Sequence, residues 1–356
     1  SPPAPPETSE KARRHATPDE EPVLGWRPAL GQVVPNTKWV LEEKLGEGGF
    51  GEVWLGRHQV MKERRVFKFC FRADRVRSLK REMTLFRLIK ERVGDHPNIV
   101  ALREVYFDQP PFYVEMDYVA GKDLRTWCEA QGGVERVPLE AKLEIVAQVA
   151  DALQAAHDAG VIHRDVKPGN ILVSNPKSEI RNPKLEAKLT DFGIGQVVSE
   201  EYLAGMTRAG FTQTMMAPSS SPTGTQLYLA PELLAGKPAS TRSDIYSLGV
   251  VLYQLISGNL SRPLATDWAD EVDDPLLRED LKHCFTGKVE DRFPGAAQLA
   301  KNLRALPERR AALARQIAER AALERAAYRR GILRTAAFAL VVILVVSLLA
   351  APAIHQ

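Results

Sequence analysis

The sequence pattern changes near residue 119, and this change constrains the fold more than any other feature. From about Trp39 onward, short runs rich in β-branched residues are separated by glycines and charged turns, which predicts antiparallel strands. After Val119 the apolar period becomes mostly helical, in two long segments that each end at a glycine, LEAKLEIVAQVADALQAAHDAG and TRSDIYSLGVVLYQLISG. Strands that precede the helices, rather than alternating with them, predict an α+β fold with a small sheet first and a mainly helical second part.

Composition and cysteine spacing exclude several other classes of protein. The chain of 356 residues has 48 basic and 45 acidic side chains, and its net charge of +3 gives no support for nucleic-acid binding. Three cysteines, Cys70, Cys128 and Cys284, are an odd number at wide spacing, which argues against a disulfide framework and against a zinc site. No internal repeat of about 20 to 50 residues is visible, so a solenoid is excluded as well.

Residues 1–35 are predicted to form a disordered, proline-rich arm. The first 22 residues combine prolines with Glu, Ser, Thr, Lys and Arg, and they include almost no large apolar side chain. Such a segment cannot bury enough surface to offset the entropy that is lost on ordering. The first folded region is therefore expected to begin at residue 36.

A glycine-rich segment at residues 46–53, GEGGFGEV, lies between two strand-like runs. Glycines there let backbone N–H groups approach phosphate oxygens without a Cβ in the way. The context excludes a dinucleotide-binding fingerprint, which needs a helix next, and a Walker A loop, which needs Gly-Lys followed by Ser or Thr. Taken alone, the segment also fits an ordinary turn.

A lysine in the third strand-like run needs a charged partner. Lys68 alternates with bulky apolar residues in RRVFKFC, and a charge that points inward from such a strand must be paired. The segment at 77–92 has apolar residues spaced three and four apart, which predicts an amphipathic helix, and Glu82 on this helix is the natural partner. From these two residues alone, two solvated surface charges are the alternative.

A further pair of motifs decides between a functional site and the two alternatives, an ordinary turn at residues 46–53 and solvated charges at Lys68 and Glu82. HRDVKPGN at residues 163–170 is followed by DFG at 191–193, and both come after the glycine-rich segment and Lys68. In order and spacing, over about residues 39–306, these motifs resemble the signature set of the protein kinases. The chain is similar to the eukaryotic-like, Hanks-type serine/threonine kinases.

This resemblance implies a two-lobed protein-kinase fold. The N-lobe and hinge would span residues 36–119, with a small antiparallel sheet and one main helix, and a mainly helical C-lobe would span residues 120–306. It also implies binding of ATP with Mg²⁺, for which Mn²⁺ is an alternative, and transfer of a phosphoryl group to protein hydroxyls. The residues that would contact ATP are Gly46, Glu47, Gly48, Gly49, Phe50, Gly51, Val53, Val66, Lys68, Met116, Asp117, Val119 and Leu172.

The catalytic roles follow from the same resemblance. Asp165 would accept or orient the proton of the substrate hydroxyl, and Lys167 resembles the lysine of kinases specific for serine and threonine. Lys68 would hold the α- and β-phosphates and be oriented by Glu82. The oxygen ligands that Mg²⁺ prefers would come from Asn170 and Asp191.

Other positions are expected to support the site. By the resemblance, Glu232 pairs with Arg292, and Asp244 braces the catalytic segment. The long activation segment at 191–232 is expected to receive phosphate in an autophosphorylation reaction.

Two apolar positions depart from the pattern of the family. Val66 replaces the commoner alanine of the strand motif, and Phe67 is bulky beside it. His163 and Phe192 are expected to be packing residues rather than an acid, a base or a ligand.

An uncharged run near the C-terminus predicts a single transmembrane helix. Residues 335–354 contain no charge, and 20 helical residues at about 1.5 Å each span the ~30 Å core of a bilayer. The preceding residues, 307–334, carry eight arginines against three glutamates, which predicts a basic juxtamembrane helix that lies on anionic lipid or pairs with a second copy. The positive-inside rule places the kinase-like region in the cytoplasm.

This organisation resembles that of the bacterial transmembrane receptor kinases. The chain would be a single-pass protein of the cell membrane that phosphorylates itself and protein substrates that the sequence does not identify. One rival is a pseudokinase that acts as a membrane scaffold, which would usually lack Lys68, Asp165 or Asp191. The other is a small-molecule phosphotransferase, which the Ala-Pro-Glu segment at 230–232 disfavours.

Overall fold

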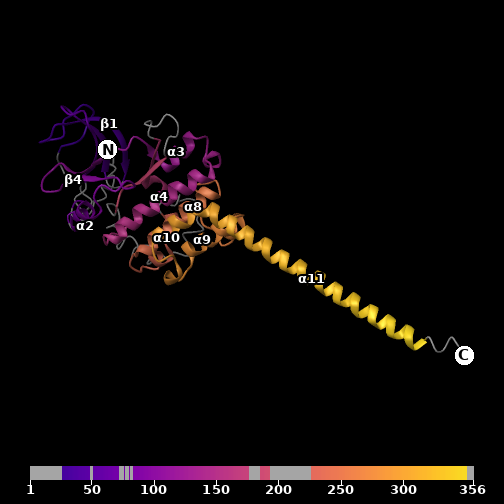
Figure 1. Ribbon diagram of the computed structural model, residues 1–356. Helices are drawn as coiled ribbons and strands as arrows, with labels where there is room; N and C mark the ends of the chain where they lie inside the picture. Colours follow the sequence, from indigo (N-terminus) through magenta and orange to yellow (C-terminus); the bar gives the residue numbers. More distant parts are fainter. Residues whose placement is uncertain are drawn as a thin grey trace, which may run out of the picture. The chain divides into compact units, whose positions relative to one another are not determined.

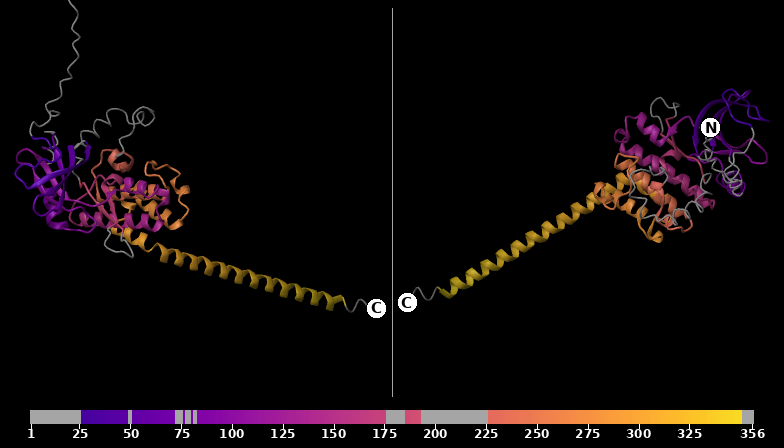
Figure 2. Two further views of the ribbon diagram at one scale, coloured as in Figure 1. Left: turned by 90° about the horizontal axis from the view of Figure 1, so that it is seen from above. Right: turned by 180° about the vertical axis from the view of Figure 1, so that it is seen from behind.

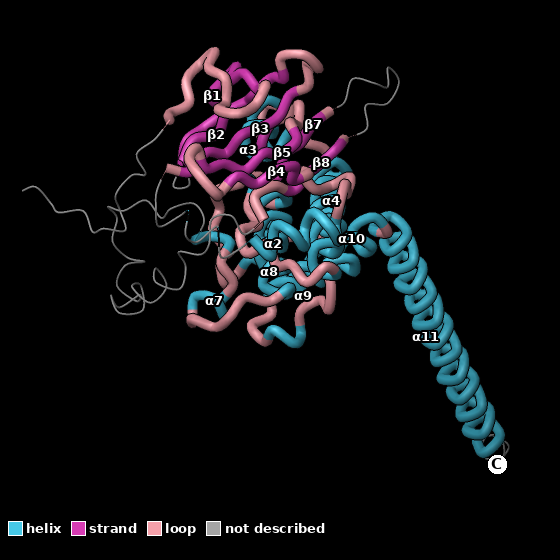
Figure 3. The backbone as a smooth tube through the Cα atoms, turned by 90° about the vertical axis from the view of Figure 1, so that its left-hand side faces the viewer, coloured by secondary structure: helices cyan, strands magenta, loops and turns pink. Residues whose placement is uncertain are grey.

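The computed structural model describes residues 26–48, 51–71, 76, 80, 83–175, 185–192 and 226–350. The chain divides into two compact units, residues 1–303 and residues 304–356. Within the first unit, five strands gather in one lobe and most of the helices in a second lobe (Figure 1 and Figure 3). This arrangement confirms the predicted two-lobed α+β fold.

The N-lobe contains a five-stranded antiparallel sheet with the strand order β1-β2-β3-β5-β4. Because side chains alternate along a strand, Val66 and Lys68 lie on one face of β3 and Phe67 and Phe69 on the other. The strands are β1 (Trp39–Gly48), β2 (Gly51–His58), β3 (Arg64–Cys70), β4 (Leu102–Tyr106) and β5 (Phe112–Asp117).

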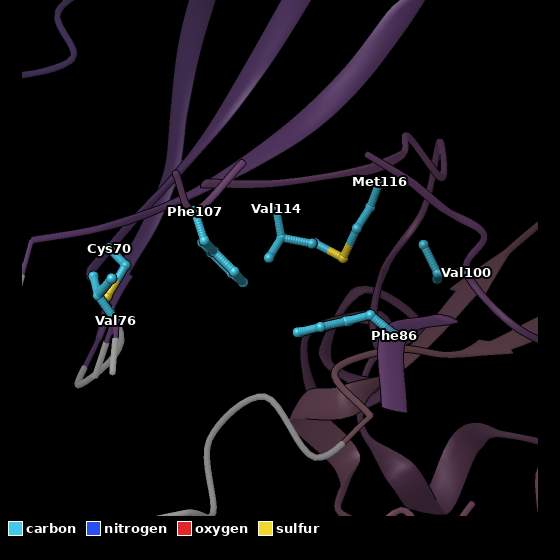
Figure 4. Packing of buried hydrophobic residues seen from close by; sticks show 7 residues of the cluster. All are labelled: Cys70, Val76, Phe86, Val100, Phe107, Val114 and Met116. Carbon is cyan, nitrogen blue, oxygen red and sulfur yellow. The ribbon is translucent and has the colours of Figure 1, made fainter. Parts of the chain in front are cut away.

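The inner face of this sheet packs against the helix that follows β3, α2 (Met83–Leu88). Phe86 of this helix lies 6.1 Å from Phe107 between ring centroids, inside a buried apolar cluster (Figure 4). Val66, Val119 and Leu172 pack against the same cluster and are only partly buried. The cluster consists of Cys70, Val76, Phe86, Val100, Phe107, Val114 and Met116.

The outer face of the sheet is covered by aromatic rings and by the segment that precedes β1. Phe67 and Phe69 both meet Tyr113 edge to face, with ring centroids 5.5 and 5.6 Å apart. The ring centroids of Trp26 and Phe69 lie 5.3 Å apart, and Val34 of the same segment is completely buried. These contacts make residues 26–38 part of the N-lobe core.

The outer face differs from one sequence-based prediction, and it also places Phe67. The folded region includes residues 26–35, which were expected to belong to a disordered arm, because Trp26 and Val34 supply the apolar anchors that the first 22 residues lack. Residues 1–25 lie outside the described part of the chain. Phe67 faces the outer aromatic cluster and not the adenine pocket, since it is one residue away from the inward-facing Val66.

Replacing Trp26 with alanine tests this packing. Trp26→Ala should lower the free energy of unfolding by about 1–3 kcal/mol, because a large and partly buried ring is lost. Leu30→Ala, in the same segment but 72% exposed, should change it by less than about 0.5 kcal/mol. Urea denaturation of both variants measures the difference, and equal effects would mean that the segment is not part of the core.

Two long helices form the centre of the C-lobe, α4 (Leu139–Asp158) and α8 (Thr241–Ile256). The first turn of α8 is held by a capping box between Ser240 and Ser243. A small sheet of β6 (Lys122–Asp123), β7 (Ile171–Ser174) and β8 (Glu186–Leu189) lies beside them. The other helices of this lobe are α3 (Leu124–Ala130), α7 (Pro231–Leu234), α9 (Pro275–Phe285), α10 (Ala296–Arg304) and the 3-10 turns Val134–Arg136, Pro168–Asn170, Gln226–Tyr228, Trp268–Glu271 and Val289–Asp291.

The second unit is dominated by one continuous helix, α11 (Leu306–Ala350), which is seen along its length in Figure 2. It includes the basic segment and the first 16 residues of the uncharged run, 335–350, whereas residues 351–354 lie outside the described part. Among the residues that the structure describes, no helix is both long and apolar enough to cross a membrane.

Candidate active site

The HRD segment, residues 163–170, is held in place by one buried aspartate. Asp244 of α8 accepts hydrogen bonds from the backbone N–H groups of His163 and Arg164, both at 2.8 Å. Arg164 has a φ of 68°, a left-handed conformation that is strained for a residue with a side chain. The carboxylate of Asp244 therefore maintains a backbone shape that the segment would not adopt alone.

A histidine that the sequence analysis did not single out completes this brace. His157, in the last turn of α4, contacts Asp244 through Nε2 at 2.8 Å, and its ring is almost completely buried. Its Nδ1 atom has no hydrogen-bond partner among the described residues. The signal in the sequence was a histidine next to the buried Ala156, in the last turn of a largely apolar helix just before the HRD segment.

His163 and Phe192 form a packing contact between the HRD and DFG segments. Their rings lie 4.6 Å apart between centroids, and His163 is completely buried. Nδ1 of His163 accepts a hydrogen bond from the N–H of Asp165, which leaves Nε2 to donate to the carbonyl of Thr190. Both ring nitrogens are thus used structurally, as the prediction of a packing role requires.

Two polar side chains of the HRD segment converge on the carboxylate of Asp165. Lys167 Nζ lies 2.8 Å from Asp165 Oδ2, and the amide nitrogen of Asn170 donates to the same oxygen at 2.9 Å. Asn170 also donates to the backbone carbonyl of Asp165 at 2.7 Å. The carboxylate is partly exposed, with 18% of the side chain accessible, so an incoming hydroxyl group can reach it.

Lys68 and Asp191, which are 123 residues apart in the sequence, meet as an ion pair at 2.9 Å. The pair joins β3 of the N-lobe to the segment after β8 of the C-lobe. Asp191 has a φ of 64°, so it is the second non-glycine residue at this site in a left-handed conformation. The predicted pair of Lys68 with Glu82 involves a residue outside the described part of the chain.

The glycine-rich segment closes the hairpin between β1 and β2. Gly46 pairs with Val53 and Gly48 with Gly51, while Gly49 and Phe50 at the tip lie outside the described residues. Gly51 has a φ of 147°, and a Cβ there would lie 2.0 Å from the carbonyl oxygen of Phe69. A side chain at position 51 would therefore push β2 away from β3.

The predicted adenine-binding residues come from both lobes and meet at the inner apolar cluster. Met116 is buried in the cluster, while Val66, Val119 and Leu172 lie at its partly exposed edge. Val53 is the register partner of Lys68 on the neighbouring strand. The backbone N–H of Asp117 donates to the carbonyl of Ala101 at 3.0 Å. Glu47, the remaining residue predicted to contact ATP, forms an ion pair with Lys44, with 2.6 Å between Oε2 and Nζ.

Two side chains at this site carry oxygen atoms suited to a divalent cation. No group of three or more His, Cys, Asp or Glu side chains that could hold a metal occurs within the described ranges. Because the amide nitrogen of Asn170 is used by Asp165, the oxygen of its side chain is the atom suited to a cation. With the carboxylate of Asp191, it offers the two oxygen ligands of a Mg²⁺ site that phosphate and water would complete.

A buried ion pair supports the C-lobe below the site, as predicted. Arg292 donates two parallel hydrogen bonds of 2.8 Å to Glu232, and Ser243 donates a third of 2.7 Å. Burial alone would raise the pKa of Glu232, but these hydrogen bonds outweigh it and lower the pKa below its ordinary value of 4.5.

The segment at 39–326 matches the family model of the protein kinase domain. The chain belongs to the protein kinase family. Several curated relatives are bacterial serine/threonine-protein kinases, from Streptomyces coelicolor, Myxococcus xanthus and Mycobacterium tuberculosis.

Two relatives show the extent of the similarity. The kinase is 31% identical to the serine/threonine-protein kinase PkaA of Streptomyces coelicolor over 296 residues, which are 76% of this chain and 50% of PkaA. It is 34% identical to PknA of Mycobacterium tuberculosis over 258 residues, 68% of this chain and 51% of PknA. The kinase therefore spans about half the length of these relatives.

A solved structure supports the fold. The kinase domain of Mycobacterium tuberculosis PknI superposes with a TM-score of 0.57 and 24% identity, and the match covers 78% of this chain and 99% of that domain.

Proposed function

We propose that this kinase transfers the γ-phosphoryl group of ATP to serine and threonine hydroxyls of proteins, with Mg²⁺ as the metal. The ion pair between Lys68 and Asp191 carries the proposal, because it brings the phosphate-binding lysine and the metal-binding carboxylate together from the two lobes. The carboxylate of Asp165, with Lys167 and Asn170 beside it, supplies the third part of the site.

The residues of the chain would position two reactants and balance charge. ATP enters between the glycine-rich hairpin and Leu172, and Lys68 holds its α- and β-phosphates. A bound Mg²⁺ ion, held by Asn170 and Asp191, supplies neutralising charge at the phosphate oxygens. Asp165 orients the substrate hydroxyl and accepts its proton as the new O–P bond forms, while the bond from the γ-phosphorus to the leaving oxygen of ADP breaks.

Incubation of the purified chain with Mg·ATP and a generic protein substrate tests this proposal. Phosphate should appear on serine and threonine residues of the substrate and of the activation segment at 191–232, where mass spectrometry can map it. Chelation of the metal with EDTA should stop the transfer. Phosphate found only on tyrosine, or undiminished transfer in EDTA, would contradict the proposal.

We also propose that residues 335–354 anchor the kinase in the cell membrane, with the kinase domain in the cytoplasm. The uncharged sequence and the arginines of 307–334 support the anchor and its orientation. The basic segment would lie on anionic lipid or pair with a second copy, which raises the local concentration for autophosphorylation between two chains.

Protease digestion of sealed vesicles of known orientation measures this topology. With the cytoplasmic face outside, the kinase domain should be digested, while a tag after Gln356 should be protected. The double substitution Val342→Lys and Val346→Lys should make the protein extractable from membranes by alkaline carbonate. The reason is that each charge near the bilayer centre raises the free energy of insertion by about 2.5–3.5 kcal/mol. Digestion of both the tag and the kinase domain from the cytoplasmic face would mean that the segment does not span.

A further inference from the structure

The side chain of the hinge residue Asp117 lies on the face of the sheet opposite the predicted adenine pocket. Its neighbour Met116 is buried in the inner cluster, so alternation along β5 directs Asp117 to the outer side. Two arginines meet its carboxylate there. Arg103 of β4 donates to Asp117 through Nε, 2.7 Å from Oδ1, and also through Nη2. Nη1 of Arg65, on β3, lies 2.8 Å from the same Oδ1 atom.

Arg103 also reaches a segment of the N-lobe that is hydrogen-bonded to the C-lobe. Arg103 Nη1 lies 2.9 Å from Asp95, at the start of the segment 95–101 that leads into β4. We call Arg65, Asp95, Arg103 and Asp117 the hinge ion cluster. Because guanidinium groups present a fixed planar fork, a cluster of two arginines and two carboxylates restricts the direction as well as the distance of each contact.

The segment 95–101 is itself fixed to the C-lobe. Its residue Val100 donates to the carbonyl of Leu189 at 2.9 Å, and Leu189 donates back to the carbonyl of Asn98 at 2.8 Å. The side-chain amide of Asn98 adds bonds to Gln148 of α4 at 3.0 Å and to Ala187 at 2.9 Å. The hinge ion cluster therefore connects a C-lobe anchor with the hinge and with β3, the strand that contains Lys68.

Apolar packing does not fill the space behind the hinge. A cavity of about 700 Å³ opens there, and all four members of the hinge ion cluster line it together with Tyr118 and Val119. The side chains of Arg65, Arg103 and Asp117 are 21%, 35% and 33% exposed. The position of the hinge on this side thus depends on charged contacts that water and salt can reach.

We propose that Asp117 is a positioning residue for nucleotide binding. Its carboxylate fixes the end of β5 against Arg65 and Arg103, and this fixes where the hinge backbone lies relative to Val66 and Leu172 on the two sides of the adenine site. The inference rests on the proposed kinase function, but it concerns the side chain of Asp117 and not the backbone groups that the family uses to bind adenine. Asp117 does not touch the reacting atoms, so its effect belongs to binding and not to phosphoryl transfer.

Nucleotide binding by the full chain, with a fluorescent ADP analogue and Mg²⁺, tests the inference without requiring turnover. Asp117→Asn retains the size of the side chain but loses its charge, and it should weaken binding by about five- to tenfold at low salt. Asp117→Glu, which keeps the carboxylate, should stay within about twofold of the wild type. The control Glu104→Gln removes one carboxylate from the residue next to Arg103 and should leave binding unchanged.

Two further measurements separate positioning from general damage to the fold. In steady-state assays, Asp117→Asn should raise KM for ATP while kcat at saturating ATP stays within about twofold, since binding is weakened equally in the ground state and the transition state. Arg103→Gln should also raise KM for ATP, although Arg65 still meets Asp117 in this variant. The double variant should lose less than the sum of the two single losses, because the two residues share one contact. High salt should reduce the difference from the wild type.

The outcomes are distinguishable. Unchanged nucleotide binding by Asp117→Asn, or additive losses in the double variant, would overturn the inference while leaving the kinase proposal intact. Tighter binding or faster turnover would also overturn it, because the cluster would then restrain the hinge instead of positioning it. A wild-type chain that binds nucleotide but transfers no phosphate would contradict the proposed function alone.

Discussion

Asp165→Asn and Asp191→Ala should each reduce phosphoryl transfer by about 100- to 10,000-fold, the range typical of a lost proton-transfer group or metal ligand. The first change removes the carboxylate on which Lys167 and Asn170 converge, and the second removes the carboxylate that pairs with Lys68. Initial rates with labelled ATP, at saturating Mg²⁺ and protein substrate, measure both losses.

The fold should survive these substitutions, because both carboxylates are partly exposed and neither belongs to the apolar core. Melting temperatures of the two variants should therefore stay close to that of the wild type. Asp270→Asn provides a matched control, since it removes an exposed aspartate far from the HRD segment in the sequence. Turnover like that of the wild type in purified Asp191→Ala would refute the assignment of the active site.

Arg292→Leu should be the most destabilising single change in the C-lobe, lowering the free energy of unfolding by about 3–5 kcal/mol. The side chain of Arg292 is completely buried, and its removal leaves the carboxylate of Glu232 charged and buried. Among the side chains that the structure describes, only Ser243 would then donate a hydrogen bond to it. Lys282→Ala should cost less than about 1 kcal/mol, because its partner Glu279 lies 4.0 Å away and both side chains are exposed.

The pH dependence of stability distinguishes this mechanism from a simple packing defect. Since the folded-state pKa of Glu232 lies below its ordinary value, ionised Glu232 stabilises the fold above pH 4.5, and this contribution is lost as the pH falls through the lowered pKa. Urea titrations of wild type and Arg292→Leu between pH 7 and pH 3 should therefore converge as Glu232 becomes protonated. Curves that stay parallel over this range would rule out the charge-based explanation.

Part of the site could be predicted from local sequence alone. Asp165, Lys167 and Asn170 lie within one short segment, so their motif determines that they are close together. Strand alternation places Phe67 on the face opposite Val66 and Lys68, so its bulk lies outside the adenine pocket.

Other features depend on contacts that no single motif encodes. Trp26 is ordered because it reaches Phe69, more than 40 residues later in the sequence, so low local hydrophobicity misplaced the start of the fold. Asp117 was expected to act through its backbone, and only the three-dimensional pairing of β3, β4 and β5 brings two arginines to its side chain. Such clusters become visible only when the strand register is known.

The brace formed by Asp244 connects the chemistry of the site to the order in which the protein folds. The HRD segment precedes α8 by about 80 residues, so during synthesis its left-handed Arg164 has no acceptor until α8 has been made and has docked. A chain that ends before residue 244 would contain every residue of the HRD and DFG segments and still lack a stable active-site backbone. The backbone shape of the active site is therefore acquired late, together with the C-lobe core.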